Sequence, residues 1–278
     1  MTKVLPGITV ALATKDDQEF VAACLESVQA IADEIVVADG ASSDGTRATL
    51  ERYGARVIPT ENKLMLNVNK NLAIAAARRE WVLLLDPDER VTPGLAAQLG
   101  ALVGREGEHS GYWLQRRDFE LGRWLRRPSP QLRFFRNGRG RFPCEHIHEM
   151  VTVAGSVGVL DGVLLHEPRQ SLFEYVHKRN LYSEHRARHL HAGGERFRLH
   201  RLLLRPAAAF VRSYGRHGGW RDGVPGLIIA SSAAYGTFLQ DAKLWQLEEA
   251  DGIRATSLPL STDIPRDDHE IVRVQGVQ

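Results

Sequence analysis

Cysteine is scarce in this sequence, which also contains neither a long apolar run nor an excess of charge of one sign. Two cysteines among 278 residues cannot build a disulfide framework, so we expect a reducing compartment and predict a cytoplasmic protein. The longest apolar stretch, residues 224–239, is interrupted by polar residues and falls short of the roughly 20 residues that span a bilayer. The N-terminal segment lacks the apolar core of an export signal. We therefore do not expect the chain to cross a membrane.

The composition favours a globular protein and gives no reason to expect nucleic acid as a partner. Basic residues number 36 and acidic residues 34, so no global positive field attracts nucleic acid. A hydrophobic content of 43% is ample for a sizeable core. Neither a G-x-G-x-x-G fingerprint nor a Walker A loop is present, which argues against the common dinucleotide-binding and P-loop folds.

Strand-like and helical segments alternate over the first 90 residues. The predicted strands cover residues 8–14, 34–38, 55–58 and 81–85. One helical pattern ends near residue 31, and two others cover residues 45–53 and 72–79. This alternation predicts an α/β fold with a parallel, doubly wound sheet. The segment 81–85 is apolar at every position, which is typical of a strand buried between two helix layers.

After about residue 93 the pattern changes to mixed α+β and then to helices. Shorter strands are predicted at residues 111–115, 132–136 and 163–166, and helices at 171–192, 198–216 and 224–249. We therefore predict a first domain over residues 1–170, a helical C-terminal extension over residues 171–250 and a loosely ordered tail over residues 251–278.

The sharpest local feature is the sequence Asp86-Pro87-Asp88-Glu89, directly after the predicted strand at residues 81–85. Open α/β sheets bind ligands at the carboxyl edge of their strands. Carboxylates at positions i and i+2 of an extended segment point to the same side, which suits Mg²⁺ or Mn²⁺ bound together with a diphosphate. The alternative is an acidic turn in which Asp88 or Glu89 caps the next helix.

The second feature is a loop of small and polar residues from Asp39 to Thr46, after the predicted strand at residues 34–38. The Asp39 carboxylate can accept a hydrogen bond from a nucleotide base or a ribose hydroxyl, and the small residues let the backbone approach a nucleotide. The alternative is an ordinary βα loop in which Ser43 or Asp44 caps the following helix.

Four segments resemble, in order and spacing, the motifs of family 2 glycosyltransferases. They are residues 8–17, 35–46, 69–73 and 80–89. The resemblance implies the glycosyltransferase A fold, which is a Rossmann-like, mostly parallel central sheet with flanking helices. It also implies a nucleotide-diphosphate sugar as donor, here expected to be a UDP-sugar, a divalent metal, and inversion of the anomeric centre.

Further motifs resemble the lipopolysaccharide core glucosyltransferase branch of that family. They lie at residues 116–119, 122–124, 132–136, 147–149, 166, 178 and 182, so that the resemblance covers about residues 8–249. It implies a glycan or glycolipid acceptor in lipopolysaccharide or other cell-envelope glycan synthesis. The sequence departs from the family pattern at Gly40-Ala41, at Pro87 and at Lys70, which keeps a positive charge but loses the bidentate geometry of arginine.

The resemblance also assigns roles to residues of the donor site. It places the metal on Asp88, with Asp86 on the metal or the ribose, so that the ion stabilises the departing nucleoside diphosphate. The residues assigned to the nucleotide-sugar are Thr14, Asp16, Asp39, Lys70, Asn71 and Asp86.

Inverting transfer also needs a base that takes the proton of the acceptor hydroxyl. Glu149 is the favoured candidate because it belongs to a motif matching the acceptor side of the family, and Asp118 and Glu145 are its rivals. The alternative for Glu149 is a surface carboxylate paired with a nearby arginine.

Two other features invite a metal interpretation. Cys144, His146 and His148 alternate along a possible strand, which would place them on one face as zinc ligands, although structural histidines are favoured. His166 can join the metal shell or form hydrogen bonds in the core, and the core role is favoured.

Two basic regions bear on the acceptor. Nine arginines fall within residues 116–141, and seven within residues 196–221, where they alternate with apolar residues at helical spacing. The second region predicts peripheral contact with an anionic membrane, on the inner face of the cytoplasmic membrane. The alternative is a solvated basic face of an ordinary helix, while nucleic acid is disfavoured because no nucleic-acid motif accompanies the charge.

Two functions other than glycosyl transfer are alternatives for this sequence. A sugar nucleotidyltransferase would normally carry a Gly-rich basic loop after the first strand, and residues 14–17 provide none. A degenerate, non-catalytic domain that binds a glycan or a partner is opposed by the intact Asp39, Asp86, Asp88 and Glu149.

Overall fold

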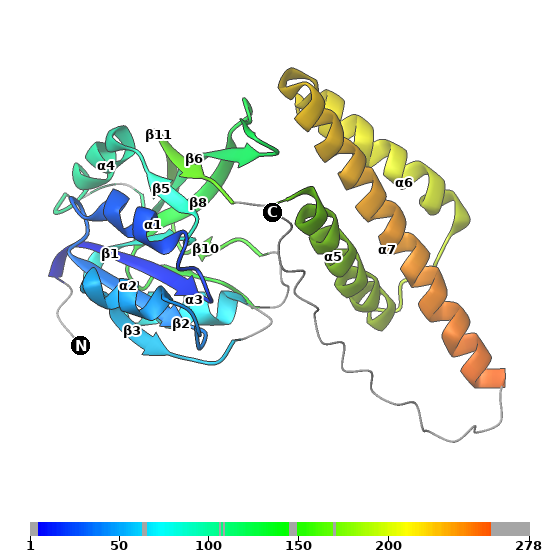
Figure 1. The fold of residues 1–278 in the computed structure, drawn as a ribbon, viewed down its shortest axis with the longest axis horizontal. Helices are drawn as coiled ribbons and strands as arrows, with labels where there is room; N and C mark the ends of the chain where they lie inside the picture. The colour runs from blue at the N-terminus through cyan, green and yellow to red at the C-terminus, as the bar shows by residue number, and fades with distance from the viewer. Residues whose placement is uncertain are drawn as a thin grey trace, which may run out of the picture. The chain divides into compact units, whose positions relative to one another are not determined.

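The computed structural model describes residues 5–62, 66–105, 107, 109–144, 149–168 and 171–256 (Figure 1). The described chain forms two compact units. The first consists of the residues up to Val176 together with Phe210–Ser231, and the second of His177–Ala209 together with the residues from Ser232 onward.

The first unit contains all of the described strands and the shorter helices. In chain order they are β1 (Leu5–Thr14), α1 (Val21–Val28), β2 (Glu34–Asp39), α2 (Thr46–Arg52), β3 (Arg56–Pro59), α3 (Leu66–Ala75), β4 (Arg79–Leu85), β5 (Glu89–Val91), α4 (Pro93–Gly100), β6 (Gly111–Glu120), β7 (Arg123–Trp124), β8 (Ser129–Arg136), β9 (Gly140–Arg141), β10 (Thr152–Val153) and β11 (Val157–His166).

Nine of the strands form a central sheet in the order β3-β2-β1-β4-β8-β6-β11-β5, with β7 paired to β6, whereas β9 and β10 form a separate antiparallel pair. The strands β3, β2, β1 and β4 are mutually parallel, as predicted for a doubly wound sheet. The antiparallel strand β8 lies between β4 and β6, and β11 runs parallel to β6. The structure therefore confirms the predicted α/β class with a mostly parallel sheet and flanking helices, and β8 and β5 account for its mixed second half.

The predicted two-sided burial of β4 is confirmed. Trp81, Leu83 and Leu85 join a core with α1, α2 and α4, whereas Val82 and Leu84 join a second core with α3 (Figure 1). These five side chains are at most 1% exposed. Because both faces of the strand are covered by apolar side chains, its carboxyl end is held firmly where the acidic sequence begins.

Some predicted ends of helices and strands were wrong, because polar side chains interrupt the apolar pattern on which the predictions were based. α3 begins at Leu66 and ends at Ala75, whereas the apolar pattern had placed a helix over residues 72–79. Its buried positions include Asn67, Asn69 and Lys70, so its first turns have no apolar periodicity. β6 and β11 are each 10 residues long, which exceeds the predictions because many of their side chains are polar or partly exposed.

The C-terminal helices are α5 (Leu172–Ala192), α6 (Leu199–Val211) and α7 (Val224–Thr256), close to the predicted ranges. A π-helical turn η1 (Arg212–Arg216) and a 3-10 turn η2 (Gly219–Asp222) separate α6 from α7. α7 continues beyond residue 251, where a loosely ordered tail had been expected, and residues 257–278 lie outside the described residues. None of the described helices has the length and apolarity required to cross a membrane.

Polar contacts connect the three helices within the second unit. Arg205 of α6 donates to Asp241 of α7 at 2.5 Å. Lys243 of α7 donates to the carbonyl of Asn180 on α5 at 2.7 Å. These contacts join α7 to both of the other helices.

Candidate active site

The carboxyl ends of β1, β2 and β4 bring the predicted donor residues to one edge of the sheet. Thr14 and Asp39 are register partners at the ends of β1 and β2, and the Thr14 hydroxyl donates to the Asp39 carboxylate at 3.3 Å. Asp86 follows β4, the other neighbour of β1. This edge is where open α/β sheets bind ligands.

Asp39 is fully buried and held by several donors. It accepts from the hydroxyl of Ser42 at 2.5 Å and from the Ser42 backbone N–H at 3.2 Å. Arg47 of α2 forms an ion pair with it at 3.1 Å. Arg47 was not recognised from the sequence, although its position in the first turn of the following helix was the available signal. The carboxylate is thereby fixed in position at the end of β2.

Asp16 joins the loop after β1 to the loop after β2. Its φ is 54°, a left-handed conformation, and its carboxylate accepts from the Ser43 backbone N–H at 2.7 Å. This hydrogen bond, together with the nearby Lys15 ammonium at 3.0 Å, lowers the pKa of Asp16 to about 2. The two loops thus form a connected rim around Asp39.

Asp86 lies between two cations. Lys70 of α3 approaches it at 2.5 Å, and Arg133 of β8 donates to its other oxygen. Burial alone would raise the pKa of Asp86, but the charges of Arg133 and Lys70 outweigh it and hold that pKa well below its usual range. Asp86 is therefore a permanently ionised group that is already paired within the protein.

Glu89 is a buried carboxylate that accepts several hydrogen bonds, and it does not cap a helix. It has no exposed surface and accepts from Arg133 at 3.1 Å, from Arg116 at 3.3 Å and from the backbone N–H of Asp86 at 2.9 Å. The cap of α4 is Thr92, which accepts from the N–H of the third helical residue. The alternative in which Asp88 or Glu89 caps the next helix was therefore wrong.

Asp88, His166 and Asp118 form a chain of contacts at the same edge. Nε2 of His166 lies 3.3 Å from an Asp88 oxygen, and Nδ1 lies 2.7 Å from an Asp118 oxygen. Arg116 also contacts this Asp118 oxygen at 2.9 Å. Burial alone would lower the pKa of His166, but the hydrogen bonds to Asp118 and Asp88 raise it to about 9.

Strand pairing explains why these three residues meet. His166 ends β11 and is the register partner of Glu89 on β5 and of Asp118 on β6. The backbone N–H of Glu167 donates to the carbonyl of Asp88 at 3.0 Å. The sequence favoured a core role for His166 and gave no sign of its contacts with Asp88 and Asp118, because these contacts depend on pairing between strands distant in the sequence.

The donor set at this edge fits a divalent cation that shares its coordination with a ligand. Among the described residues, no group of three or more histidine, cysteine or carboxylate side chains converges as a complete metal cage. Asp88 and His166 do converge, and the contact of His166 Nδ1 with a carboxylate is the support that metal-binding histidines commonly have. Mg²⁺ is commonly held by one or two carboxylates together with phosphate oxygens of the ligand, a role that Asp88 can fill.

The electrostatics of the rim also suit a cation. Burial raises the pKa of Asp17 to about 6, against the hydrogen bond from the Lys15 N–H, and the charges of Asp88, Asp44 and Asp86 contribute to the rise. Carboxylates that disfavour one another's ionisation concentrate negative potential at the carboxyl edge. A divalent cation would relieve this repulsion.

The acceptor-side candidates are placed less completely. Glu149 accepts from the Cys144 backbone N–H at 2.6 Å. Cys144 has a φ of 62° and lies outside any strand, so a metal-binding strand face beginning at Cys144 is wrong. The remaining candidates of this segment lie outside the described residues; they are Glu145, His146 and His148.

Asn71 of α3 contacts this segment rather than the carboxyl edge. Its side-chain amide accepts from the Phe142 N–H at 2.9 Å and donates to the Phe142 carbonyl at 3.0 Å. Its neighbour Lys70 faces Asp86, so the two adjacent residues anchor different parts of the site. The assignment of Asn71 to the nucleotide-sugar stays a prediction.

Comparison with known proteins shows which family the chain belongs to. The family model described as Glycosyl transferase family 2 matches residues 9–160. The lipopolysaccharide core biosynthesis glycosyltransferase LpsC of Rhizobium meliloti is 31% identical over 243 residues, which cover 83% of this chain and 89% of LpsC. An uncharacterized glycosyltransferase of Rickettsia typhi is 24% identical over 255 residues, covering 86% of this chain and 87% of that protein. The chain therefore belongs to glycosyltransferase family 2.

Solved structures give more distant likenesses. The fragment 1–349 of S. aureus TarS in complex with UDP aligns over 89% of this chain and 92% of its own, with 14% identity and a TM-score of 0.44. Glucosyl-3-phosphoglycerate synthase of Mycobacterium tuberculosis, solved with Mn²⁺ and UDP, aligns over 41% of this chain and 44% of its own, with 21% identity and a TM-score of 0.32. Family membership itself makes the chain a glycosyltransferase, and the nucleotidyltransferase and non-catalytic alternatives fall away.

Proposed function

We propose that this glycosyltransferase transfers a sugar from a UDP-sugar to an acceptor hydroxyl, with inversion and with the help of Mg²⁺ or Mn²⁺. The observation that carries the proposal is the meeting of Asp88 and His166 at 3.3 Å, at the sheet edge where Asp39 ends β2. We infer that the nucleotide and the cation would bind side by side at this edge.

The donor half of the site follows from the rim. Asp39, held by Ser42 and Arg47, is positioned to accept from the uracil imide or a ribose hydroxyl. Thr14 and Asp16 belong to the same rim and would line the nucleotide pocket. Lys70 reaches this edge beside Asp86, so its charge also lies within reach of a diphosphate.

Asp88 and His166 are the proposed protein ligands of the metal. Bound there, the cation would neutralise charge on the departing nucleoside diphosphate. Asp118 contacts Nδ1 of His166, which leaves Nε2 oriented toward Asp88. Asp86 is already paired with Lys70 and Arg133, so we propose that it acts mainly by positioning these cations, with the metal or the ribose as a further contact.

Glu149 is the proposed base that takes the proton of the acceptor hydroxyl. Asp118, its rival, is shared between Arg116 and His166, and this geometry supports a positioning role. Removing a general base lowers turnover by about 10²–10⁴-fold. We expect Glu149→Gln to lose activity on that scale while it still binds donor. Asp118→Asn should instead weaken metal binding, and an equal loss of turnover without that effect would assign the base to Asp118.

Calorimetric and thermal-shift titrations test the donor site. UDP-, GDP- and dTDP-sugars are added with and without Mn²⁺ to wild type, to Asp88→Ala and to the exposed control Asp161→Ala. A ligand at 100 times its Kd stabilises the folded state by about 2.7 kcal/mol. We expect metal-dependent stabilisation by UDP-sugar in wild type and in the control, and its loss in Asp88→Ala. Equal stabilisation of all three proteins would refute the metal site.

For the acceptor we propose a glycan or glycolipid of the lipopolysaccharide core. The relative LpsC, which spans most of this chain, bears lipopolysaccharide core biosynthesis in its name. The test is transfer of radiolabelled sugar from the stabilising donor to purified core oligosaccharide, with a neutral storage glucan as control. Incorporation into the core alone supports the proposal, and incorporation into the glucan alone contradicts it.

We also propose that α6 makes peripheral contact with an anionic membrane. Leu199, Leu203 and Leu204 of this helix are 65–66% exposed, whereas Arg205 on its other side pairs with Asp241 of α7. An exposed apolar stripe on a helix in an arginine-rich region fits the headgroup layer of an anionic bilayer.

Vesicle co-sedimentation tests the membrane contact. Phosphatidylglycerol vesicles should bind wild type more strongly than phosphatidylcholine vesicles do, and the double substitution Leu203→Ser/Leu204→Ser should weaken binding. Ala250→Ser, an exposed position near the end of α7, is the control. Binding unaffected by the leucine substitutions would exclude α6 as the contact.

A further inference from the structure

The strand that carries Asp118 continues into a short hairpin. β6 turns back as β7, so that Phe119 lies opposite Trp124. The backbone N–H of Leu125 donates to the carbonyl of Asp118 at 2.8 Å. The segment Arg123–Arg126 is therefore fixed directly beside the strand that carries Asp118.

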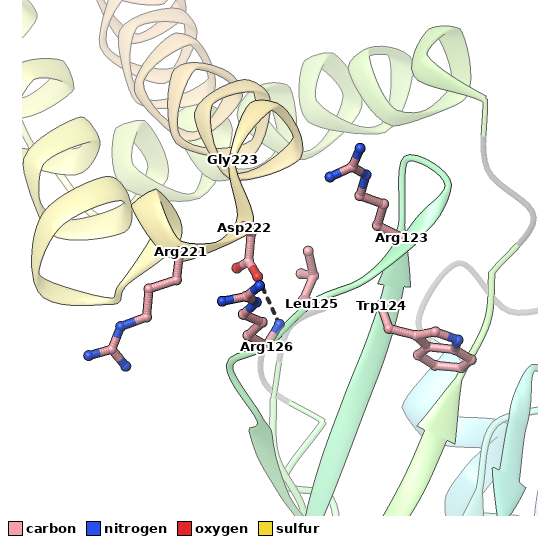
Figure 2. Close-up of a pocket in the computed structure, with 7 residues that line it drawn as sticks. All are labelled: Arg123, Trp124, Leu125, Arg126, Arg221, Asp222 and Gly223. Carbon is pink, nitrogen blue, oxygen red and sulfur yellow. Dashed lines mark hydrogen bonds between the residues drawn. The ribbon is translucent and has the colours of Figure 1, made fainter.

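A pocket of about 280 Å³ opens at this hairpin (Figure 2). One wall is the segment Arg123–Arg126, and the other is Arg221–Gly223, which precedes α7. The walls are joined by a hydrogen bond from the backbone N–H of Arg126 to the Asp222 carboxylate at 2.8 Å, drawn as the dashed line in Figure 2. Typical ligand pockets measure about 300–1,000 Å³, so this one suits a single sugar-sized group rather than an oligosaccharide.

The lining of the pocket is strongly basic. Arg123, Arg126 and Arg221 are exposed, and no carboxylate in the described part of the chain forms an ion pair with their guanidinium groups. Asp222 is the single acidic residue of the lining, and it is engaged by a backbone N–H. By contrast, the two arginines of β6 and β8 at the active-site edge are each paired with two carboxylates.

Neighbouring residues extend the positive charge. The guanidinium of Arg117 lies 5.8 Å from the centre of the Trp124 ring. The pKa of His217 is lowered, first by burial and then by the charges of three surrounding arginines, which are Arg127, Arg212 and Arg216. Unpaired arginines around a partly apolar pocket are suited to bidentate recognition of phosphate oxygens.

We propose that this pocket is a subsite for a phosphate group carried by a sugar of the acceptor, so that the enzyme selects a phosphorylated glycan. The inference rests on the proposed glycosyl transfer and adds the chemical class of the acceptor. The three arginines of the lining supply guanidinium donors for phosphate oxygens, and Leu125, which lies between them in Figure 2, supplies apolar surface for the sugar ring. The hairpin places the subsite beside Asp118, which contacts the proposed metal ligand His166.

Isothermal titration of the full-length protein with glucose 6-phosphate tests this subsite, with glucose and glucuronate as probes of the same ring without phosphate. The variants are Arg123→Gln, Arg221→Gln and the double variant, and Arg52→Gln removes an exposed arginine of α2 as a matched control. Ionic strength is held constant because exposed charges are screened by salt.

We expect wild type and Arg52→Gln to bind glucose 6-phosphate more tightly than glucuronate, with no measurable binding of glucose. Each pocket substitution should weaken glucose 6-phosphate binding by roughly tenfold or more, as expected for a lost hydrogen bond to a charged group. No binding by wild type, equal binding of glucose, tighter binding of glucuronate, or undiminished binding by the double variant would each overturn the proposal.

A measurement of donor binding distinguishes failure of the phosphate subsite from failure of the proposed function. Titration of wild type with UDP-sugar and Mn²⁺ reports on the Asp88 edge and does not require the pocket. If donor binds and glucose 6-phosphate does not, the subsite is wrong and the transfer reaction stands. If glucose 6-phosphate binds through Arg123 and Arg221 but no donor binds, the pocket stands as an anion site and the proposed function fails.

Discussion

The buried carboxylate of Glu89 should be one of the larger single contributors to the stability of the first unit. Glu89→Gln removes the charge that Arg116 and Arg133 face, while it keeps an oxygen that can accept the N–H of Asp86. Removing one partner of a buried pair costs about 3–5 kcal/mol. Each arginine retains a second carboxylate, so we expect the lower end, about 3 kcal/mol.

Urea unfolding followed by tryptophan fluorescence measures this effect. Trp81 is 1% exposed and stacks on Phe134 with ring centres 4.6 Å apart, so its emission should follow loss of the core. For a unit of this size, about 3 kcal/mol corresponds to a fall in Tm of roughly 6–12 °C. Glu51→Gln is the same chemical change at an exposed site of α2 and should stay within about 0.5 kcal/mol of wild type. A loss below about 1 kcal/mol for Glu89→Gln would show that the arginines do not depend on its charge.

Three further effects should be measurable by the same unfolding assay. A Cβ added at Gly162 would lie 2.6 Å from the Cα of Leu95, so Gly162→Ala should lower the free energy of unfolding by about 1–3 kcal/mol. A Cβ added at Gly94 in α4 would meet no neighbouring atom within 4 Å, so Gly94→Ala should stabilise the protein by up to about 1 kcal/mol. Asn71→Ala removes two hydrogen bonds to backbone groups and should cost about 1–3 kcal/mol; an unchanged midpoint would show that this anchor is dispensable. The pKa of Asp17 is raised from 3.8 to about 6 in the folded state, so the free energy of unfolding of wild type should fall as pH rises from about 4 to 6. Asp17→Asn should be more stable than wild type above pH 6 and equally stable near pH 4. Parallel pH profiles of the two proteins would contradict the shift.

The sequence predicted those parts of the fold that depend on local pattern. The apolar run of β4 and the acidic residues after it lie together in the chain, so both the strand and the edge it leads to could be inferred. α3 was misplaced because its buried positions include Asn67 and Lys70, which carry no apolar periodicity. Because of such buried polar residues, the boundaries of the elements were predicted less accurately than their order.

The electrostatics of the site could not be inferred in the same way. The contacts of Glu89 with Arg116 and Arg133 depend on β8 lying beside β4 and on β6 lying beside β8, which follows from tertiary pairing. The same holds for His166, whose distance from Asp88 is set by the register of β11 with β5. The sequence supplied the residues, and strand order determined which of them meet.

Affinity for Mn²⁺ in the presence of UDP, measured across a double-mutant cycle of Asp88→Asn and His166→Asn, tests the central claim most directly. If both side chains hold the same ion, each single substitution should remove most of the affinity and the double variant should be little worse than either. Independent, additive losses, or affinity unchanged in both single variants, would contradict a metal site built from these two residues.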